Sequence, residues 1–132
     1  MRSIRFACLL AAALALPAAA GAVDWKAAGK TYGGNDVFVD LDGVRVGGDV
    51  RTAWVRVDYA RPVELPNGSA RSIQALAHFD CRKGASAGIR VIFYADATTG
   101  RVLLVSEEET VRMSPDPDGS FGKLAGQAIC AR

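Results

Sequence analysis

The chain has 132 residues, which is enough for one domain of ordinary size but not for two. It contains 16 Lys and Arg and 14 Asp and Glu residues, for a net charge of +2. Two of the cations, Arg2 and Arg5, lie in the first 22 residues, so a mature chain without this segment has 14 of each sign. A balanced charge argues against a general nucleic-acid binder, because such proteins attach to phosphates through many uncompensated cations.

Residues 1–22 have the pattern of a cleavable secretory signal sequence. A short basic start is followed by an apolar run, Phe6–Leu16, and then by a proline and small residues. The apolar run has eleven residues, whereas a membrane-spanning helix needs about 20, so no transmembrane segment is expected after cleavage. The small residues suit cleavage before Val23 or before Gly21, and we take residues 23–132 as the mature domain.

Two of the three cysteines, Cys81 and Cys130, remain after the signal sequence is removed. In an exported chain an even number of cysteines predicts a disulfide, and two cysteines allow only one intramolecular pairing. A redox or metal site is the alternative, but the sequence has no Cys-x-x-Cys pair and His78 is its sole histidine. We therefore predict a disulfide between Cys81 and Cys130, with no metal or other cofactor.

The first half of the mature chain alternates between apolar and polar residues, the pattern of strands with one buried face. A polar leader at 23–35 precedes the first expected strand, at 37–41, which resumes at 44–46 after an Asp-Gly turn. In the next strand, 50–59, one face is apolar and the other polar. Trp54 is the exception, because it stands on the polar face.

Further strands follow in the second half. A loop with two prolines and an Asn-Gly turn is predicted for 61–69. The strand at 70–81 alternates again and places its last residue, a cysteine, on the apolar face, which suits a buried disulfide. After a basic turn at 82–86, two more strands are expected at 88–94 and 101–106.

The C-terminal part changes from strand to helix. Residues 113–120 include two prolines, which cannot donate to a sheet ladder, so a loop is expected there. Apolar residues then recur at helical spacing over 121–129, with Ser120 as the N-cap. A helix this short is marginal alone, and the disulfide would hold it on the sheet. The predicted fold class is α+β: an antiparallel sheet of five to six strands with one C-terminal helix tethered to it by the disulfide.

No constellation for catalysis or metal binding is evident in the sequence. A catalytic triad needs a nucleophile and an acid beside its histidine, and no Gly-x-Ser-x-Gly motif accompanies His78. The segment Ser114–Gly119 is similar to the start of a calcium loop, but the twelfth position, which should be a glutamate, is Ala125. We expect a chain that is not an enzyme and has no cofactor.

Four residues are candidates for contact with a protein partner. Arg82 and Lys83, together with Arg90, form a small basic group that could steer an acidic partner. Trp54 stands on the polar face of its strand, where an aromatic residue often marks an interface, including one between two copies of a chain. Packing of Trp54 beneath the helix or the N-terminal segment is the alternative interpretation.

A series of short landmarks runs along the mature chain. They are Val37-Phe38-Val39-Asp40, Val57-Asp58-Tyr59, Ala70-Arg71-Ser72, Asp80-Cys81, Phe93-Tyr94, Ser114-Pro115-Asp116 and Gln127-Ala128-Ile129-Cys130-Ala131. In this order, with the two cysteines at matching ends, they resemble the surface-adhesin protein E family of Gram-negative bacteria. The resemblance implies an antiparallel sheet with the C-terminal helix tied to its concave side, and an envelope protein that dimerises and binds host proteins.

These observations lead to one functional hypothesis and one alternative. The hypothesis is a non-enzymatic binding protein of the cell envelope, exported to the periplasm or the cell surface of a Gram-negative bacterium. A protein partner and a homodimer are expected. The alternative is a periplasmic enzyme inhibitor, similar to lysozyme inhibitors, that inserts the loop at 61–69 or the loop at 113–120 into a cleft.

Overall fold

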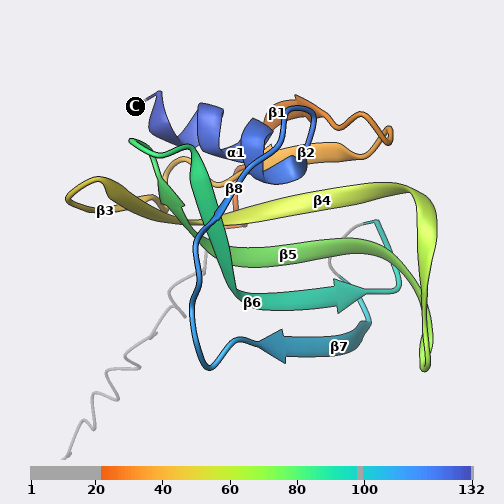
Figure 1. Cartoon of the computed structure of the whole chain (residues 1–132). Coiled ribbons are helices and arrows are strands. Elements are labelled where there is room, and N and C mark those ends of the chain that lie inside the picture. The colour runs from red at the N-terminus through yellow and green to blue at the C-terminus, as the bar shows by residue number, and fades with distance from the viewer. Residues whose placement is uncertain (1–21, 98–99, 132) are drawn as a thin grey trace, which may run out of the picture.

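The computed structural model describes residues 22–97 and 100–131, and residues 1–21 of the predicted signal sequence lie outside the described residues. The described chain forms one sheet of eight strands and one helix that packs on a face of the sheet (Figure 1). The elements are β1 (Lys26–Lys30), β2 (Asp36–Val39), β3 (Arg45–Gly47), β4 (Val50–Leu65), β5 (Gly68–Asp80), β6 (Ala85–Tyr94), β7 (Val102–Glu107), β8 (Ser114–Pro115) and α1 (Phe121–Cys130).

The strands cross the sheet in the order β1-β2-β4-β5-β6-β7, with β3 paired to β4 and β8 paired to β6. All these pairings are antiparallel. The predicted α+β fold class, with one helix after the strands, is confirmed. The sheet has eight strands rather than five or six, because β1 and β8 form in segments that lack a strand pattern.

The two additional strands owe their conformation to their neighbours. β1 occupies the polar leader and pairs with β2, with Lys26 opposite Val39 and Lys30 opposite Asp36. β8 lies in the segment that was expected to be a loop, and Pro115 is placed opposite the start of β6. A proline is tolerated at the margin of a sheet, where its missing N–H leaves no acceptor unpaired within the ladder. The expectation of irregular chain at these two places was wrong.

The alternation of β4 and β5 builds the hydrophobic core. The residues of these strands that point toward α1 are buried: Ala53, Val55, Val57, Ile73, Ala75, Ala77 and Phe79. From β2, Val37 and Val39 join them, and from α1 the core receives Ala125 and Ile129, all four of which are 0 % exposed. Each large aliphatic side chain buried in this way contributes about 1.5–3 kcal/mol.

The helix begins and ends close to where its sequence predicts. The Ser120 hydroxyl accepts the backbone N–H of Lys123 at 3.2 Å, so Ser120 is the N-cap. Gly122, Ala125 and Ile129 form the buried side of α1 at helical spacing. Within residues 22–97 and 100–131, no helix is long and apolar enough to cross a membrane.

The β4–β5 hairpin is longer than expected. The sequence predicts a loop from 61 to 69, but β4 continues to Leu65 and β5 begins at Gly68, so only the tip is a turn. A bulge between Asp58 and Val63 interrupts the hydrogen-bond ladder of the two strands. Pro62, which has no N–H, lies within this bulge. Beyond the bulge the hairpin bends toward β7 (Figure 1), and the Asn67 side-chain amide donates to the backbone carbonyl of Leu103.

Successive side chains of a strand point to opposite faces of a sheet. The core positions therefore define the face that α1 covers, and the residues between them define a second face with no described helix on it. We call this second surface the helix-free face. Its central side chains are Phe38, Trp54, Arg56, Gln74, Leu76, Arg90, Ile92 and Val105.

Candidate functional site

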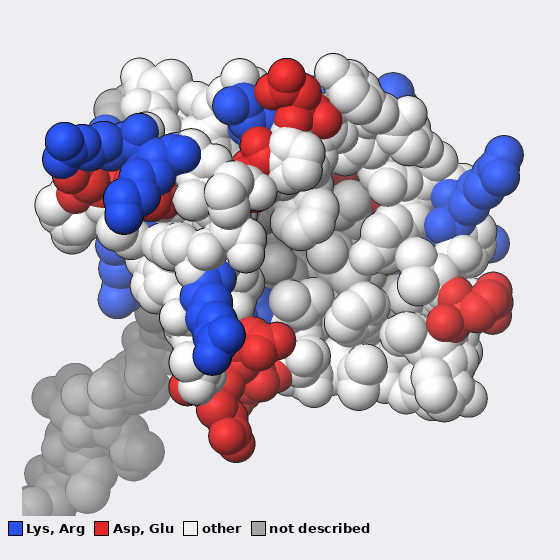
Figure 2. Space-filling model, viewed as in Figure 1, with Lys and Arg blue, Asp and Glu red and all other residues white. Residues whose placement is uncertain are grey.

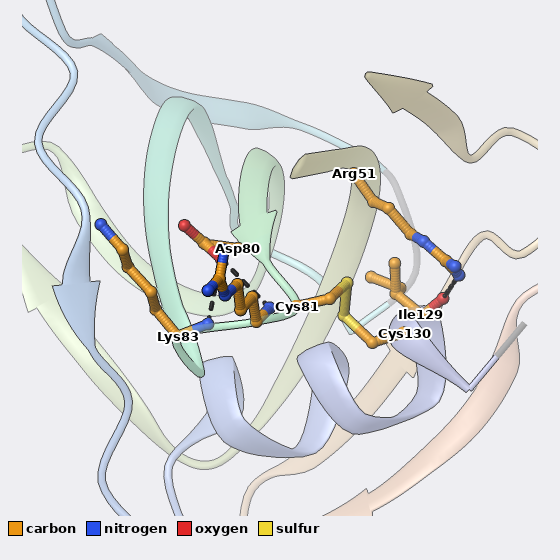
Figure 3. The surroundings of a disulfide bond; sticks show 7 residues. Arg51, Asp80, Cys81, Lys83, Ile129 and Cys130 are labelled. Carbon is orange, nitrogen blue, oxygen red and sulfur yellow. Dashed lines mark hydrogen bonds between the residues drawn. A yellow bond between two sulfur atoms is a disulfide. The ribbon is translucent and has the colours of Figure 1, made fainter. Parts of the chain in front are cut away.

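The predicted disulfide is present and joins the sheet to the helix. Cys81, immediately after β5, is bonded to Cys130 at the end of α1, with 5.6 Å between their Cα atoms (Figure 3). On the other side of the helix end, the Arg51 guanidinium donates to the backbone carbonyl of Ile129 at 2.6 Å. A cation at a helix C-terminus satisfies a free carbonyl and interacts favourably with the helix dipole.

The contact made by Arg51 had no signal in the sequence. Arg51 looks like a surface residue of an alternating strand, yet it lies opposite Phe79 and shares the covered face with the core. Its role depends on the helix crossing that face near the end of β4. Only the tertiary structure brings the two together.

Arg82 and Lys83 lie in the turn that connects β5 to β6. The Asp80 carboxylate accepts the backbone N–H groups of both residues, at 3.1 and 3.0 Å, and so shapes the turn (Figure 3). Both side chains are exposed. In Figure 2, basic side chains gather at the upper left, over the part of the molecule where this turn lies in Figure 1.

The other two candidates, Trp54 and Arg90, lie in one row on the helix-free face. Trp54 of β4 is directly opposite Leu76 of β5, and Leu76 is directly opposite Arg90 of β6. Arg90 continues the row to Glu107 of β7, with 3.4 Å between Nε and Oε1. Trp54 and Leu76 are half-buried and Arg90 is exposed. Trp54 and Arg90 therefore lie on the same surface, whereas Arg82 and Lys83 lie in a separate turn.

The helix-free face also carries an ion pair along β4 that the sequence did not reveal. The Arg56 guanidinium donates twice to the Asp58 carboxylate, at 2.9 and 2.6 Å, and lies over the Phe38 ring, 4.9 Å from its centre. The hydrogen bond to Asp58 raises the pKa of Arg56, and burial opposes this shift. Because Phe38 and Arg56 come from different strands, their stacking follows only from the β2–β4 register.

The lone histidine is also on the helix-free face. His78 of β5 is opposite Thr52 of β4, and the Thr52 hydroxyl and His78 Nδ1 are 2.7 Å apart. Among the described residues, His78 forms no side-chain hydrogen bond with a carboxylate. A catalytic triad requires such a carboxylate beside its histidine. Among the described residues, no three His, Cys, Asp or Glu side chains gather in a way that could hold a metal ion.

Comparisons with known proteins agree with this arrangement. The selenomethionine form of Haemophilus influenzae protein E is 17% identical to this chain, with a TM-score of 0.54 and coverage of 84% of this chain and 88% of that one. Crystal form II of the same protein is 17% identical, with a TM-score of 0.52 and coverage of 72% and 80%. At this identity the likeness shows the fold alone. A search of curated proteins found no significant match.

The family assignment rests on the sequence itself. The family model described as surface-adhesin protein E matches residues 25–131, which include all the strands, the helix and both bonded cysteines. The landmarks identified in the sequence fall within the same range. The chain belongs to the surface-adhesin protein E family.

Proposed function

We propose that the mature chain is an exported, non-enzymatic binding protein of the bacterial cell envelope that contacts a protein partner through its helix-free face. The family is one of bacterial surface adhesins, which supports a binding role. A disulfide between two distant segments fits an oxidising compartment, the periplasm or the cell surface of a Gram-negative bacterium.

The row of Trp54, Leu76 and Arg90 is the observation that carries the proposal. Tryptophan and arginine are enriched at protein interfaces and among the residues that dominate their binding energy. Here the two flank a leucine on a sheet surface that the helix does not cover. The neighbouring row adds Phe38, stacked under Arg56, so apolar and charged groups are interleaved across the surface.

The alternative of a periplasmic enzyme inhibitor has less support. It relied on loops at 61–69 and 113–120, but most of the first segment is paired into the β4–β5 hairpin. Part of the second is paired as β8. Neither the family match nor the protein E structures indicate inhibition of an enzyme. A muramidase assay with the purified protein serves as the discriminating control.

Substitution of Trp54 is expected to weaken partner binding. A panel of immobilised host matrix proteins is probed with the wild-type mature chain and with the Trp54→Ala variant, and affinities are measured by surface plasmon resonance. We expect at least one panel member to bind and the variant to bind about tenfold more weakly or worse, as for an interface aromatic residue. Tyr32→Ala is the matched control, because Tyr32 is a highly exposed aromatic residue, 85 % exposed, in the β1–β2 turn.

Two results contradict the proposal. One is equal binding by wild type and Trp54→Ala, provided that circular dichroism shows both to be folded. The other is potent inhibition of a muramidase in the absence of binding to any matrix protein, which favours the inhibitor alternative.

A second copy of the chain is a further partner that the same face is expected to bind. The mature chain has equal numbers of acidic and basic side chains, so there is no overall repulsion between copies. Light scattering at micromolar concentration is expected to give twice the mass of the mature chain for the wild type and a lower average mass for Trp54→Glu. A wild type that stays monomeric over this range shows that the face does not self-associate.

A further inference from the structure

A small slot lies between the helix and the β5–β6 turn, away from the row of Trp54 and Arg90. Its volume is about 150 Å³. Its lining comes from the end of β5, the turn, the start of β6, the segment before the helix, and the helix itself: Phe79, Asp80, Cys81, Gly84, Ala85, Asp116, Gly122, Lys123, Gly126, Gln127 and Cys130. The disulfide forms part of the wall.

The interior of the slot is mainly apolar. The Phe79 ring, the disulfide and Ala85 line it. Two of the lining residues on the helix are glycines, which have no side chain to fill the slot. A cavity of about 150 Å³ accommodates one benzene-sized group, whereas pockets for small-molecule ligands measure roughly 300–1,000 Å³. The slot therefore fits one apolar side chain rather than a whole metabolite.

The two helix glycines differ in what the fold requires of them. A Cβ at Gly122 would collide with the Asp116 carboxylate and the Ser86 hydroxyl, which are hydrogen-bonded to each other at 2.7 Å. A Cβ at Gly126 would meet only the Phe79 ring, at 3.4 Å, and the backbone there is ordinary helix. Alanine is the better helix former, so packing does not explain this second glycine. Its effect is to keep the slot open.

Three basic side chains lie around the slot. Arg82 and Lys83 extend from the turn between two lining residues, and Lys123 lies on the helix side; none of the three forms an ion pair among the described residues. The lining also contains the carboxylates of Asp80 and Asp116, which accept hydrogen bonds from neutral groups and keep their negative charge. Three cations and two carboxylates leave a net charge of +1 around the slot, which favours an acidic partner.

We propose that this slot is a docking site for an acidic peptide segment of a protein partner, which inserts one apolar side chain between the helix and the β5–β6 turn. The inserted group packs on Phe79 and the disulfide, and acidic residues beside it pair with Arg82, Lys83 and Lys123. An apolar anchor in a fitted pocket with charged groups at its margin is the usual form of an interface hot spot. This site goes beyond the proposed function, because it uses a surface separate from the helix-free face.

A peptide array tests the proposal directly. Nine-residue peptides carry every amino acid in turn at the central position, flanked either by Glu and Ser or by Lys and Ser. They are probed with the labelled, oxidised wild-type chain. Signals are expected for Glu-flanked peptides with a central Leu, Ile or Phe, about tenfold above those with a central Ala. Lys-flanked peptides are expected to give none.

Variants locate the binding on the molecule. Gly126→Leu fills the slot and Lys123→Glu reverses one charge at its margin, and each is expected to lower the peptide signal at least tenfold. Gly126→Ala is the control for folding, because its methyl group fits beside Phe79 and favours the helix; its unfolding midpoint should equal or exceed that of the wild type. Trp54→Ala should leave the peptide signal unchanged, which separates this site from the helix-free face.

Four outcomes overturn the proposal. The first three are the absence of any signal from the Glu-flanked peptides, equal signals with central Ala and central Leu, and full binding by a folded Gly126→Leu variant. Loss of the signal in Trp54→Ala alone would assign the peptide to the helix-free face and would remove the slot from consideration. None of these results affects the matrix-protein measurement, so the two proposals fail independently.

Discussion

Replacing Cys81 and Cys130 together with serine is expected to lower the free energy of unfolding by about 4 kcal/mol. The bond joins residues 49 positions apart, so it removes much of the conformational freedom of the unfolded chain. It also holds a ten-residue helix that would be marginal by itself. Since domains of this kind have a stability of about 5–15 kcal/mol, the double variant should be close to unfolding at 37 °C. Urea unfolding at 15 °C, followed by tryptophan fluorescence, measures the difference.

Reductant provides the matched control for this experiment. Dithiothreitol should shift the wild-type midpoint to that of the double variant and should leave the variant's midpoint unchanged. If the oxidised wild type and the double variant unfold at the same urea concentration, the helix is held by its packing alone. The role assigned to the disulfide would then be wrong.

The Ile129→Ala substitution is expected to cost about 3 kcal/mol, within the range for large-to-small changes in a core. Ile129 is 0 % exposed and packs among the side chains of β2, β4 and β5. Its removal leaves a cavity that the surrounding strands can fill only in part, because each is fixed by pairing on both sides. The disulfide at the next residue keeps the helix in place, so the loss reports on packing. Thermal and urea unfolding of the oxidised variant measure it.

Phe121 is the matched control, at the other end of the same helix. It is larger than isoleucine but 46 % exposed, so Phe121→Ala should change the free energy of unfolding by less than about 1 kcal/mol. Equal losses for the two variants would mean that the helix is not anchored through its C-terminal turn. Such a result would contradict the arrangement of the core described above.

The local sequence pattern was enough to predict the strands at 50–59 and 70–81, the C-terminal helix, and the disulfide that joins the helix to the sheet. In 53–59 and 73–81 every second residue is apolar, and burial of one face follows from that period whatever the neighbouring strands are. Ser120 and the apolar spacing after it specify a capped helix in the same local way. The pairing of Cys81 with Cys130 was predicted from the expectation that the chain is exported and keeps two cysteines, and the structure contains this bond.

The segments that the sequence failed to predict depend on contacts between distant residues. β1 has no strand pattern of its own and exists because β2 offers it a ladder. The β4–β5 hairpin continues past Pro62 because the bulge there needs no backbone N–H from this residue. At its tip, Asn67 donates a hydrogen bond to Leu103, which is 36 residues away in the sequence. Local preferences of about 1 kcal/mol or less are readily overridden by such pairings.

The candidate binding surfaces likewise combine features that the sequence predicted with features that only the tertiary structure showed. The sequence identified Trp54, Arg82, Lys83 and Arg90 as unusual from composition and strand parity alone. It could not show that Trp54 and Arg90 share a row through Leu76, because the register across three strands is set by pairing and by the bulge in β6. Nor could it show the slot, since this opens only where the helix, placed by the disulfide, crosses the β5–β6 turn. The sequence by itself determined which faces are apolar, and the tertiary structure decided which of them remain uncovered.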